Sequence, residues 1–279
     1  MKKISRRSFM AAAAVSVAAL ALTACGGSAS SAASSVASSA ASSEAVSSAA
    51  AAELTTVEAG KLTMATNATF PPYEMTTDSG EIEGIDVDTA KAIAEKLGLE
   101  LQIDDMDFDA ALLSVQQGKA DIVMAGVTVT DERKAVMDFS DSYATGIQSI
   151  IVPEGSDIAS PDDLAGKMIG TQRGTTGYIY CSDDFGDNAV VAYDDGLTAV
   201  QALNNGQVDA VVIDNAPAQE FVAANPGLKI LDTAYAQEDY AIGVAKGNTQ
   251  LLDAINGALE ELQDDGTLQA IVNKYITAE

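Results

Sequence analysis

Residues 118–128 read GKADIVMAGVT, residues 206–214 read GQVDAVVID, and these two stretches decide the fold. In each, a glycine follows an amphipathic stretch, and an aspartate stands before a short apolar run. Glycine is common just past the end of a helix, and a short apolar run indicates a buried strand. The repeated helix–glycine–aspartate–strand pattern therefore predicts two α/β units of related topology.

The flanking sequence continues this pattern, because short apolar runs alternate with amphipathic stretches from Leu62 onward. The expected strands cover residues 62–66, 99–103, 122–124, 167–171 and 208–213. The expected helices cover residues 86–97, 110–117 (capped by Asp109), 197–203 and 249–263. Open α/β sheets bind ligands beyond the carboxyl ends of their strands, which nominates the loops at Asn67, 125–128, 172–176 and Asp214.

Composition excludes several classes of function. The 279 residues include 15 Lys and Arg against 41 Asp and Glu, for a net charge of −26. A nucleic-acid partner is not expected, because such proteins neutralise phosphates with a basic face. The chain has no His and only two Cys, which removes Ser-His-Asp catalysis, His-ligated metals and any disulfide framework. We expect no cofactor and no metal, and a soluble, acidic, ligand-binding body.

The N-terminus has the pattern of an export signal. Lys2, Lys3, Arg6 and Arg7 precede an apolar stretch over 9–24 that is short for a membrane span of about 20 residues. Residues 22–25 (LTAC) resemble the lipobox of bacterial lipoproteins, which implies acylation of Cys25. The alternative is an ordinary signal with an incidental Cys. Residues 5–9 (SRRSF) also resemble a twin-arginine signal.

Residues 26–52 are almost all Ser, Ala and Gly. No apolar stripe is present to bury, so residues 26–56 are expected to be a flexible tether. Residues 1–25 are then the lipoprotein export signal. The mature body is expected outside the cytoplasm, held to the cell membrane by lipid.

Arg133 and Asp214 are the charged candidates for ligand contact. A guanidinium matches a carboxylate in a bidentate way, and an aspartate at a strand end can accept from an ammonium. The alternatives are a solvated helix-end position for Arg133 and a helix N-cap for Asp214. Phe70 and Phe108 are candidates for stacking on a ligand, and a core position is the alternative for each.

Several motifs carry a resemblance to one family. Residues 63–73 (TMATNATFPPY), 84–90 (GIDVDTA), 125–133 (AGVTVTDER), 138–143 (DFSDSY), 208–214 (VDAVVID) and 265–275 (DGTLQAIVNKY) stand in order along the chain. They resemble the family 3 extracellular solute-binding proteins of amino-acid ABC transporters, from about Leu62 to the C-terminus. The loop at 125–133 is most similar to glutamine- and polar-amino-acid-binding members.

The resemblance implies an α/β, two-lobed, periplasmic-binding-protein-like (type II) fold with a ligand cleft between the lobes. The chain would cross between lobes near 143–147 and 238–242. One lobe would contain residues 57–143 plus 242–279, and the other residues 147–238. The ligand is expected to be a free amino acid, delivered to an ABC transporter permease by a monomeric protein that is not an enzyme.

The resemblance also assigns roles to single residues. Arg133 would bind the α-carboxylate with help from Gly126, Thr128 and Thr176, through backbone or hydroxyl donors. Asp214 would bind the α-amino group, and Phe70 and Phe108 would sandwich the side chain. Asn67 and Gln172 would line the side-chain pocket. Asn67 stands where the family often has Asp, which favours a neutral polar ligand over a cationic one, while Arg173 could favour an acidic one.

Two other functions stay open at this point. Some relatives of this family are dehydratases, so an enzyme on the same fold is one alternative. A sensory solute receptor is the other. The presence of both Arg133 and Asp214 favours simple capture of an amino acid.

Overall fold

The computed structural model describes residues 54–276. The export signal, Cys25 and the tether as far as residue 53 lie outside the described residues. The strands are β1 (Lys61–Thr66), β2 (Thr69–Phe70), β3 (Glu74–Thr76), β4 (Ile82–Glu83), β5 (Glu100–Asp105), β6 (Ile122–Val123), β7 (Met137–Pro153), β8 (Ile169–Gln172), β9 (Val190–Tyr193), β10 (Ala210–Asp214), β11 (Leu228–Ile230) and β12 (Ala236–Ala245). The α-helices are α1 (Ile85–Leu97), α2 (Phe108–Gln116), α3 (Asp131–Val136), α4 (Thr176–Phe185), α5 (Gly196–Asn204), α6 (Asn215–Ala224), α7 (Thr249–Asp264) and α8 (Thr267–Tyr275). Short 3-10 helices cover Pro161–Leu164 and Asp187–Ala189.

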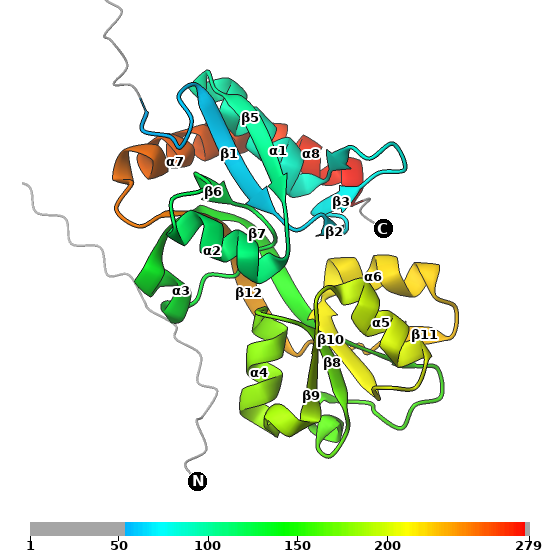
Figure 1. The fold of residues 1–279 in the computed structure, drawn as a ribbon. Coiled ribbons are helices and arrows are strands. Elements are labelled where there is room, and N and C mark those ends of the chain that lie inside the picture. Colours follow the sequence, from blue (N-terminus) through cyan, green and yellow to red (C-terminus); the bar gives the residue numbers. More distant parts are fainter. Residues whose placement is uncertain (1–53, 277–279) are drawn as a thin grey trace, which may run out of the picture. The chain divides into compact units, whose positions relative to one another are not determined.

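One mixed sheet joins two lobes (Figure 1). Its order is β5-β1-β6-β12-β7-β10-β8-β9, with β11 added to β7. Strands β5, β1 and β6 are parallel in the first lobe, and β10, β8 and β9 are parallel in the second. The long strands β7 and β12 pair antiparallel between these sets and join them. The expected crossings at 143–147 and 238–242 lie inside β7 and β12.

The two halves share a detail that explains the repeated aspartate. In the first lobe, Asp121 donates its amide to the Thr63 carbonyl at 2.9 Å, and its carboxylate accepts from the Thr63 amide at 2.8 Å. In the second, Asp209 makes the same exchange with Met168, at 2.7 and 2.8 Å. Each aspartate therefore ties its strand to the neighbouring strand, and the sequence repeat corresponds to a structural repeat.

The helices begin and end largely where the sequence predicts. Helix α1 ends at Gly98, which has the left-handed conformation (φ 69°) that favours glycine. One cap was wrong: α2 begins at Phe108 with Asp107 in the N-cap position, so Asp109 lies in the first turn and caps nothing. The earlier start buries Phe108 in a core cluster with Val115 and other apolar side chains.

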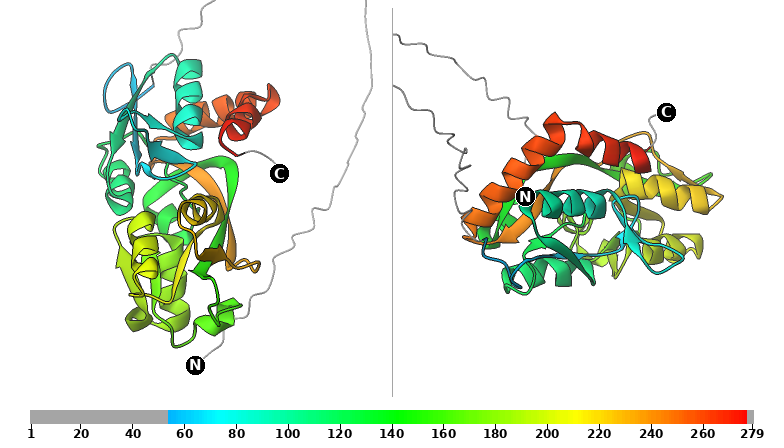
Figure 2. Two further views of the ribbon diagram at one scale, coloured as in Figure 1. Left: turned by 90° about the vertical axis from the view of Figure 1, so that its right-hand side faces the viewer. Right: turned by 90° about the horizontal axis from the view of Figure 1, so that it is seen from above.

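The C-terminal helices return to the first lobe. Helices α7 and α8 pack against each other and against α1, as the orange-to-red segment shows in Figure 2. Leu251, Ile255, Leu259 and Leu262 are buried on one face of α7, as expected for a core stripe, while Leu252 is half-buried. Within residues 54–276, none of the helices has the length and apolar character needed to cross a membrane.

Candidate functional site

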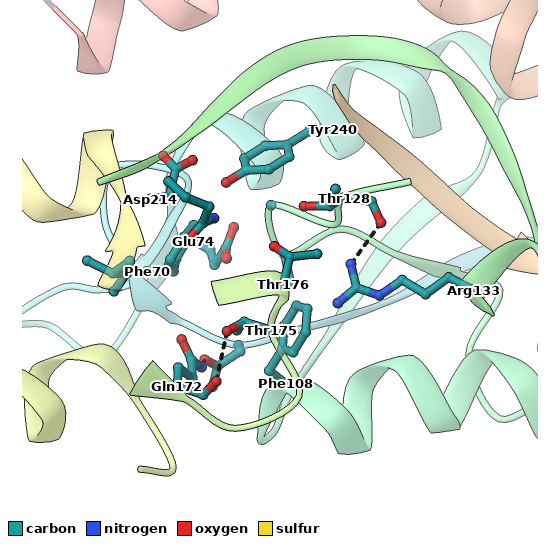
Figure 3. Close-up of a pocket in the computed structure, with 15 residues that line it drawn as sticks. Phe70, Glu74, Phe108, Thr128, Arg133, Gln172, Thr175, Thr176, Asp214 and Tyr240 are labelled. Carbon is teal, nitrogen blue, oxygen red and sulfur yellow. Dashed lines mark hydrogen bonds between the residues drawn. The ribbon is translucent and has the colours of Figure 1, made fainter. Parts of the chain in front are cut away.

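A pocket lies between the lobes, where the carboxyl ends of the parallel strands meet. It holds about 410 Å³ of space free of atoms, part of it open to solvent. Its lining, much of which Figure 3 labels, comprises Asn67, Phe70, Glu74, Phe108, Ala125, Gly126, Thr128, Arg133, Gln148, Gln172, Thr175, Thr176, Ile213, Asp214 and Tyr240. All nine residues nominated from the sequence are among them.

Arg133 reaches the pocket from the short helix α3, which the Thr130 hydroxyl caps by accepting from the Arg133 amide. Its side chain is only 8% exposed, so the solvated helix-end alternative is wrong. Nη1 donates to the Thr128 carbonyl at 2.7 Å, and Nη2 donates across the pocket to the Gly174 carbonyl at 3.1 Å. A guanidinium has five N–H groups, so three remain for a ligand.

The Arg133 guanidinium has an apolar ring on one side and forms no ion pair within the described residues. The Phe108 ring lies under the guanidinium, with 5.3 Å between the carbon Cζ and the ring centroid. Burial lowers the pKa of Arg133, and the nearby charge of Glu238 opposes that shift. Within residues 54–276, no carboxylate forms an ion pair with Arg133. The site therefore presents a buried cation that an anionic group of a ligand can reach.

Asp214 ends β10 and enters the pocket from the second lobe. It is the N-cap of α6, because Oδ1 accepts from the Ala216 amide at 3.2 Å. The helix N-cap was the alternative to a ligand contact in the sequence analysis, and Asp214 both caps the helix and lines the pocket. Oδ2 accepts from the Ile147 amide at 2.7 Å. Burial raises the pKa of Asp214 to about 6, and the Tyr240 hydroxyl opposes this rise. Arg133 and Asp214 approach the pocket from different sides in Figure 3.

Two amide side chains join the lobes at another part of the pocket. Gln172, the last residue of β8, donates from Nε2 to Oδ1 of Asn67 at 2.9 Å. Asn67, which follows β1, donates from Nδ2 to the Met106 carbonyl at 3.0 Å. The neighbouring Arg173 is largely exposed and contacts Asp194 instead of the pocket. The pair Asn67–Gln172 is uncharged and has both hydrogen-bond donors and acceptors.

The aromatic candidates serve the core and the pocket together. Phe70 and Phe108 are both buried in apolar clusters, which is the core position given as the alternative, and both also line the pocket. Phe70 stacks on Tyr73 with ring centroids 5.9 Å apart. Their rings are therefore fixed by packing before any ligand arrives.

The proposed small donors are arranged differently from the expectation. The Gly126 amide donates to Oδ2 of Asp86 at 3.0 Å, so it is committed to the scaffold. The Thr128 and Thr176 hydroxyls donate to Oε2 of Glu238, at 3.0 and 2.9 Å. Their protons are thus also committed, because a hydroxyl has only one. Gly126, Thr128 and Thr176 therefore line the pocket, but the Gly126 amide and the two threonine hydroxyls already donate to protein acceptors.

Sequence reasoning missed the acids Glu74, Asp86 and Glu238 and the ring of Tyr240. Glu74 is fully buried, and its two carboxylate oxygens have no hydrogen-bond partner among the described residues. Burial, followed by the charge of Asp86, raises the pKa of Glu74 well above its usual value. Strand alternation could have indicated Glu238, because it stands two residues before Tyr240 and so shares its face.

Asp86 supports the loop beside the pocket. Its Oδ2 accepts from the Tyr143 hydroxyl at 2.8 Å as well as from Gly126. Burial raises the pKa of Asp86 to about 6, and these hydrogen bonds oppose the rise. Among residues 54–276, no group of three or more His, Cys, Asp or Glu side chains is arranged to hold a metal ion.

Comparison with known proteins identifies the family. Residues 62–278 match the family described as bacterial extracellular solute-binding proteins, family 3. The chain belongs to this family. It is 34% identical to the L-cystine-binding protein TcyJ of Escherichia coli strain K12, over 80% of this chain and 85% of that protein. It is 35% identical to a probable histidine-binding protein of Neisseria gonorrhoeae, over 96% and 95%.

The solved structures agree with the fold. An ancestral arginine-binding protein bound to glutamine superposes with a TM-score of 0.76 and 43% identity, over 79% of this chain and all of that one. The fold is the two-lobed type II periplasmic-binding-protein fold expected from the sequence. Members of the family are solute-binding proteins and not enzymes, which removes the dehydratase alternative.

Proposed function

We propose that this chain is the substrate-binding component of an ABC importer that captures a free amino acid between its lobes. The observation that carries the proposal is the separate presence of a buried cation and a buried acid, Arg133 and Asp214, in one pocket. The α-carboxylate would bind Arg133 and the α-ammonium Asp214. Contacts from both lobes are complete only when the cleft is shut, so the ligand would favour the closed form that a permease recognises.

We propose a neutral polar side chain for the ligand. The side-chain amides of Asn67 and Gln172 offer hydrogen-bond donors and acceptors without charge, and the rings of Phe70 and Phe108 offer flat apolar faces. Burial raises the pKa of Glu74 well above its usual value and so favours the uncharged form of that carboxyl. The ancestral relative bound to glutamine is consistent with such a ligand.

A cationic side chain is the second candidate, because Glu74 lines the pocket with both oxygens unpartnered among the described residues. A guanidinium or ammonium near Glu74 would lower the pKa of that carboxyl again and favour its charged form. The name of the ancestral relative as an arginine-binding protein agrees with this possibility. The two candidates differ in a measurable way, since only the cationic ligand would release a proton from Glu74.

Titration calorimetry with the twenty amino acids and cystine, after bound ligand has been stripped by unfolding and refolding, tests both proposals. Tight binding of glutamine or another neutral polar amino acid, with a heat whose buffer dependence Glu74→Gln leaves unchanged, would support the first. Tight binding of arginine with a buffer-dependent heat that Glu74→Gln abolishes would favour the second. A panel without binding would contradict both.

Three further features of the sequence belong to the same proposal. We propose that Cys25 carries the lipid that tethers the body outside the cytoplasm. The protein would act as a monomer, with lobes of residues 57–143 plus 242–279 and 147–238. Labelling of growing cells with a fatty-acid analogue, and its loss in Cys25→Ser, checks the anchor.

A further inference from the structure

Glu238 is a buried acid on one of the two crossing strands, and its carboxylate contacts both lobes. Its side chain is 7% exposed. Oε2 accepts from Thr128 in the first lobe, from Thr176 at the start of α4 in the second lobe, and from Nε2 of Gln148 at 3.1 Å on β7. One oxygen therefore gathers three donors from three separate segments around the pocket.

These hydrogen bonds depend on the relative position of the lobes. Thr128 follows β6 of the first lobe and Thr176 follows β8 of the second lobe, so the two hydroxyls belong to different lobes. Both can reach the same oxygen only while the lobes are together. The bonds between Arg133 and Gly174 and between Asn67 and Gln172 also cross the pocket, but neither involves a crossing strand.

The charge of Glu238 acts on the same site. It is the first of the charges that raise the pKa of Arg133 against burial. It also contributes, after burial, to raising the pKa of Tyr180 to about 12. Its second oxygen, Oε1, is buried without a hydrogen-bond partner in the described chain. Glu238 thus supplies a negative charge to the surroundings of Arg133.

We propose that Glu238 is a positioning residue for amino-acid capture, which holds the Thr128 and Thr176 hydroxyls together and so stabilises the closed cleft. This rests on the proposed function. With the hydroxyl protons directed to Glu238, the carboxylate of the ligand is left to Arg133. Part of the closing free energy is then built into the protein and does not have to come from the ligand.

The test compares Glu238→Ala, Glu238→Gln and the control Asp239→Asn, an exposed acid on the same strand. Glutamine retains an oxygen that can accept from both hydroxyls, whereas alanine retains none. Closure without ligand is measured by the distance between spin labels on Leu113→Cys in α2 and Leu197→Cys in α5, in a full chain that carries Cys25→Ser and Cys181→Ala. Both labelled positions are exposed.

We expect Glu238→Ala to lower the ligand-free closed fraction and to weaken binding of the tightest amino acid by about tenfold, mainly through faster dissociation. Glu238→Gln and Asp239→Asn should stay within about threefold of the wild type. In the wild type, the effects of Thr128→Val and Thr176→Val on the dissociation rate of the amino acid should be non-additive. In the Glu238→Ala background the two effects should be additive.

An unchanged closed fraction and affinity in Glu238→Ala would overturn the proposal. Equal damage by Glu238→Gln would overturn it too, because a shared oxygen acceptor would then not be the cause. If Glu238→Ala does not fold, the Thr128→Val and Thr176→Val variants in the wild type and in Glu238→Gln still test the proposal. Additive effects of the two variants there would contradict a shared acceptor oxygen on residue 238. The closed fraction is measured without ligand, so a failure to bind amino acids would count against the proposed function and not against this inference.

Discussion

Replacing Arg133 by Met removes the buried guanidinium and keeps a side chain of similar length against Phe108. The wild-type guanidinium spends two N–H groups on the Thr128 and Gly174 carbonyls and has three left. A bidentate pair with the α-carboxylate would use two of them, and each charged hydrogen bond contributes about 1.5–3 kcal/mol. The expected loss of binding free energy is therefore about 3–6 kcal/mol, or roughly 10² to 10⁴ in Kd.

Stability should change far less than affinity. The two carbonyls lose a partner, but the cost of burying an uncompensated charge disappears at the same time. Titration calorimetry gives Kd, and a thermal melt without ligand shows that the fold survives. Lys134→Met on the same helix is the matched control, because Lys134 is exposed. A folded Arg133→Met protein that binds within about tenfold of the wild type would refute the role of Arg133 as carboxylate ligand.

Other substitutions test separate parts of the structure. Affinity should weaken as the pH falls below about 6, because Asp214 is then protonated and must lose its proton before an ammonium binds. An Asp214→Asn protein should bind weakly and show no such pH dependence. A wild-type affinity that does not change with pH would count against the role of Asp214. A Cβ at Gly146 would lie 2.5 Å from the Tyr240 ring and 2.7 Å from Oδ2 of Asp214, so Gly146→Ala should reduce affinity measured by calorimetry and cost about 1–3 kcal/mol of stability in a denaturant titration. Gly257 is an exposed position of α7 with open space around a Cβ, so Gly257→Ala should instead stabilise by up to about 1 kcal/mol in the same titration. Asp209→Ala removes the carboxylate bond to a neighbouring strand and should destabilise by about 1–3 kcal/mol, with little change in Kd; no change in the melting temperature would contradict the structural role.

The sequence predicted the architecture well because its signals are local. The glycine and aspartate before β6 and β10 indicated where helices end and strands begin, and the strand ends then indicated the pocket. The start of α2 was placed too late because Asp109 resembles a cap, whereas burial of Phe108 decides where the helix begins. Local preference is weaker than core packing at that position.

Side-chain partners were not predictable in the same way. Glu74 stands in the short strand β3 and Glu238 in the long strand β12, and the local sequence of neither strand indicates which residues approach from the other lobe. The commitment of the Thr128 and Thr176 hydroxyls follows from contacts across more than sixty residues of sequence. Whether a nominated residue has a free donor therefore depends on the assembled pocket and not on its type.

The return of α7 and α8 to α1 also bears on the order in which the chain folds as it is made. The segment from β8 to β11 is continuous, and its parallel strands have all been synthesised before α7 begins. Helix α1, by contrast, has part of its apolar face covered by α7 and α8, which are made after that segment. The half of the body that starts first is thus completed last, because part of its apolar surface stays uncovered until α7 and α8 have been made.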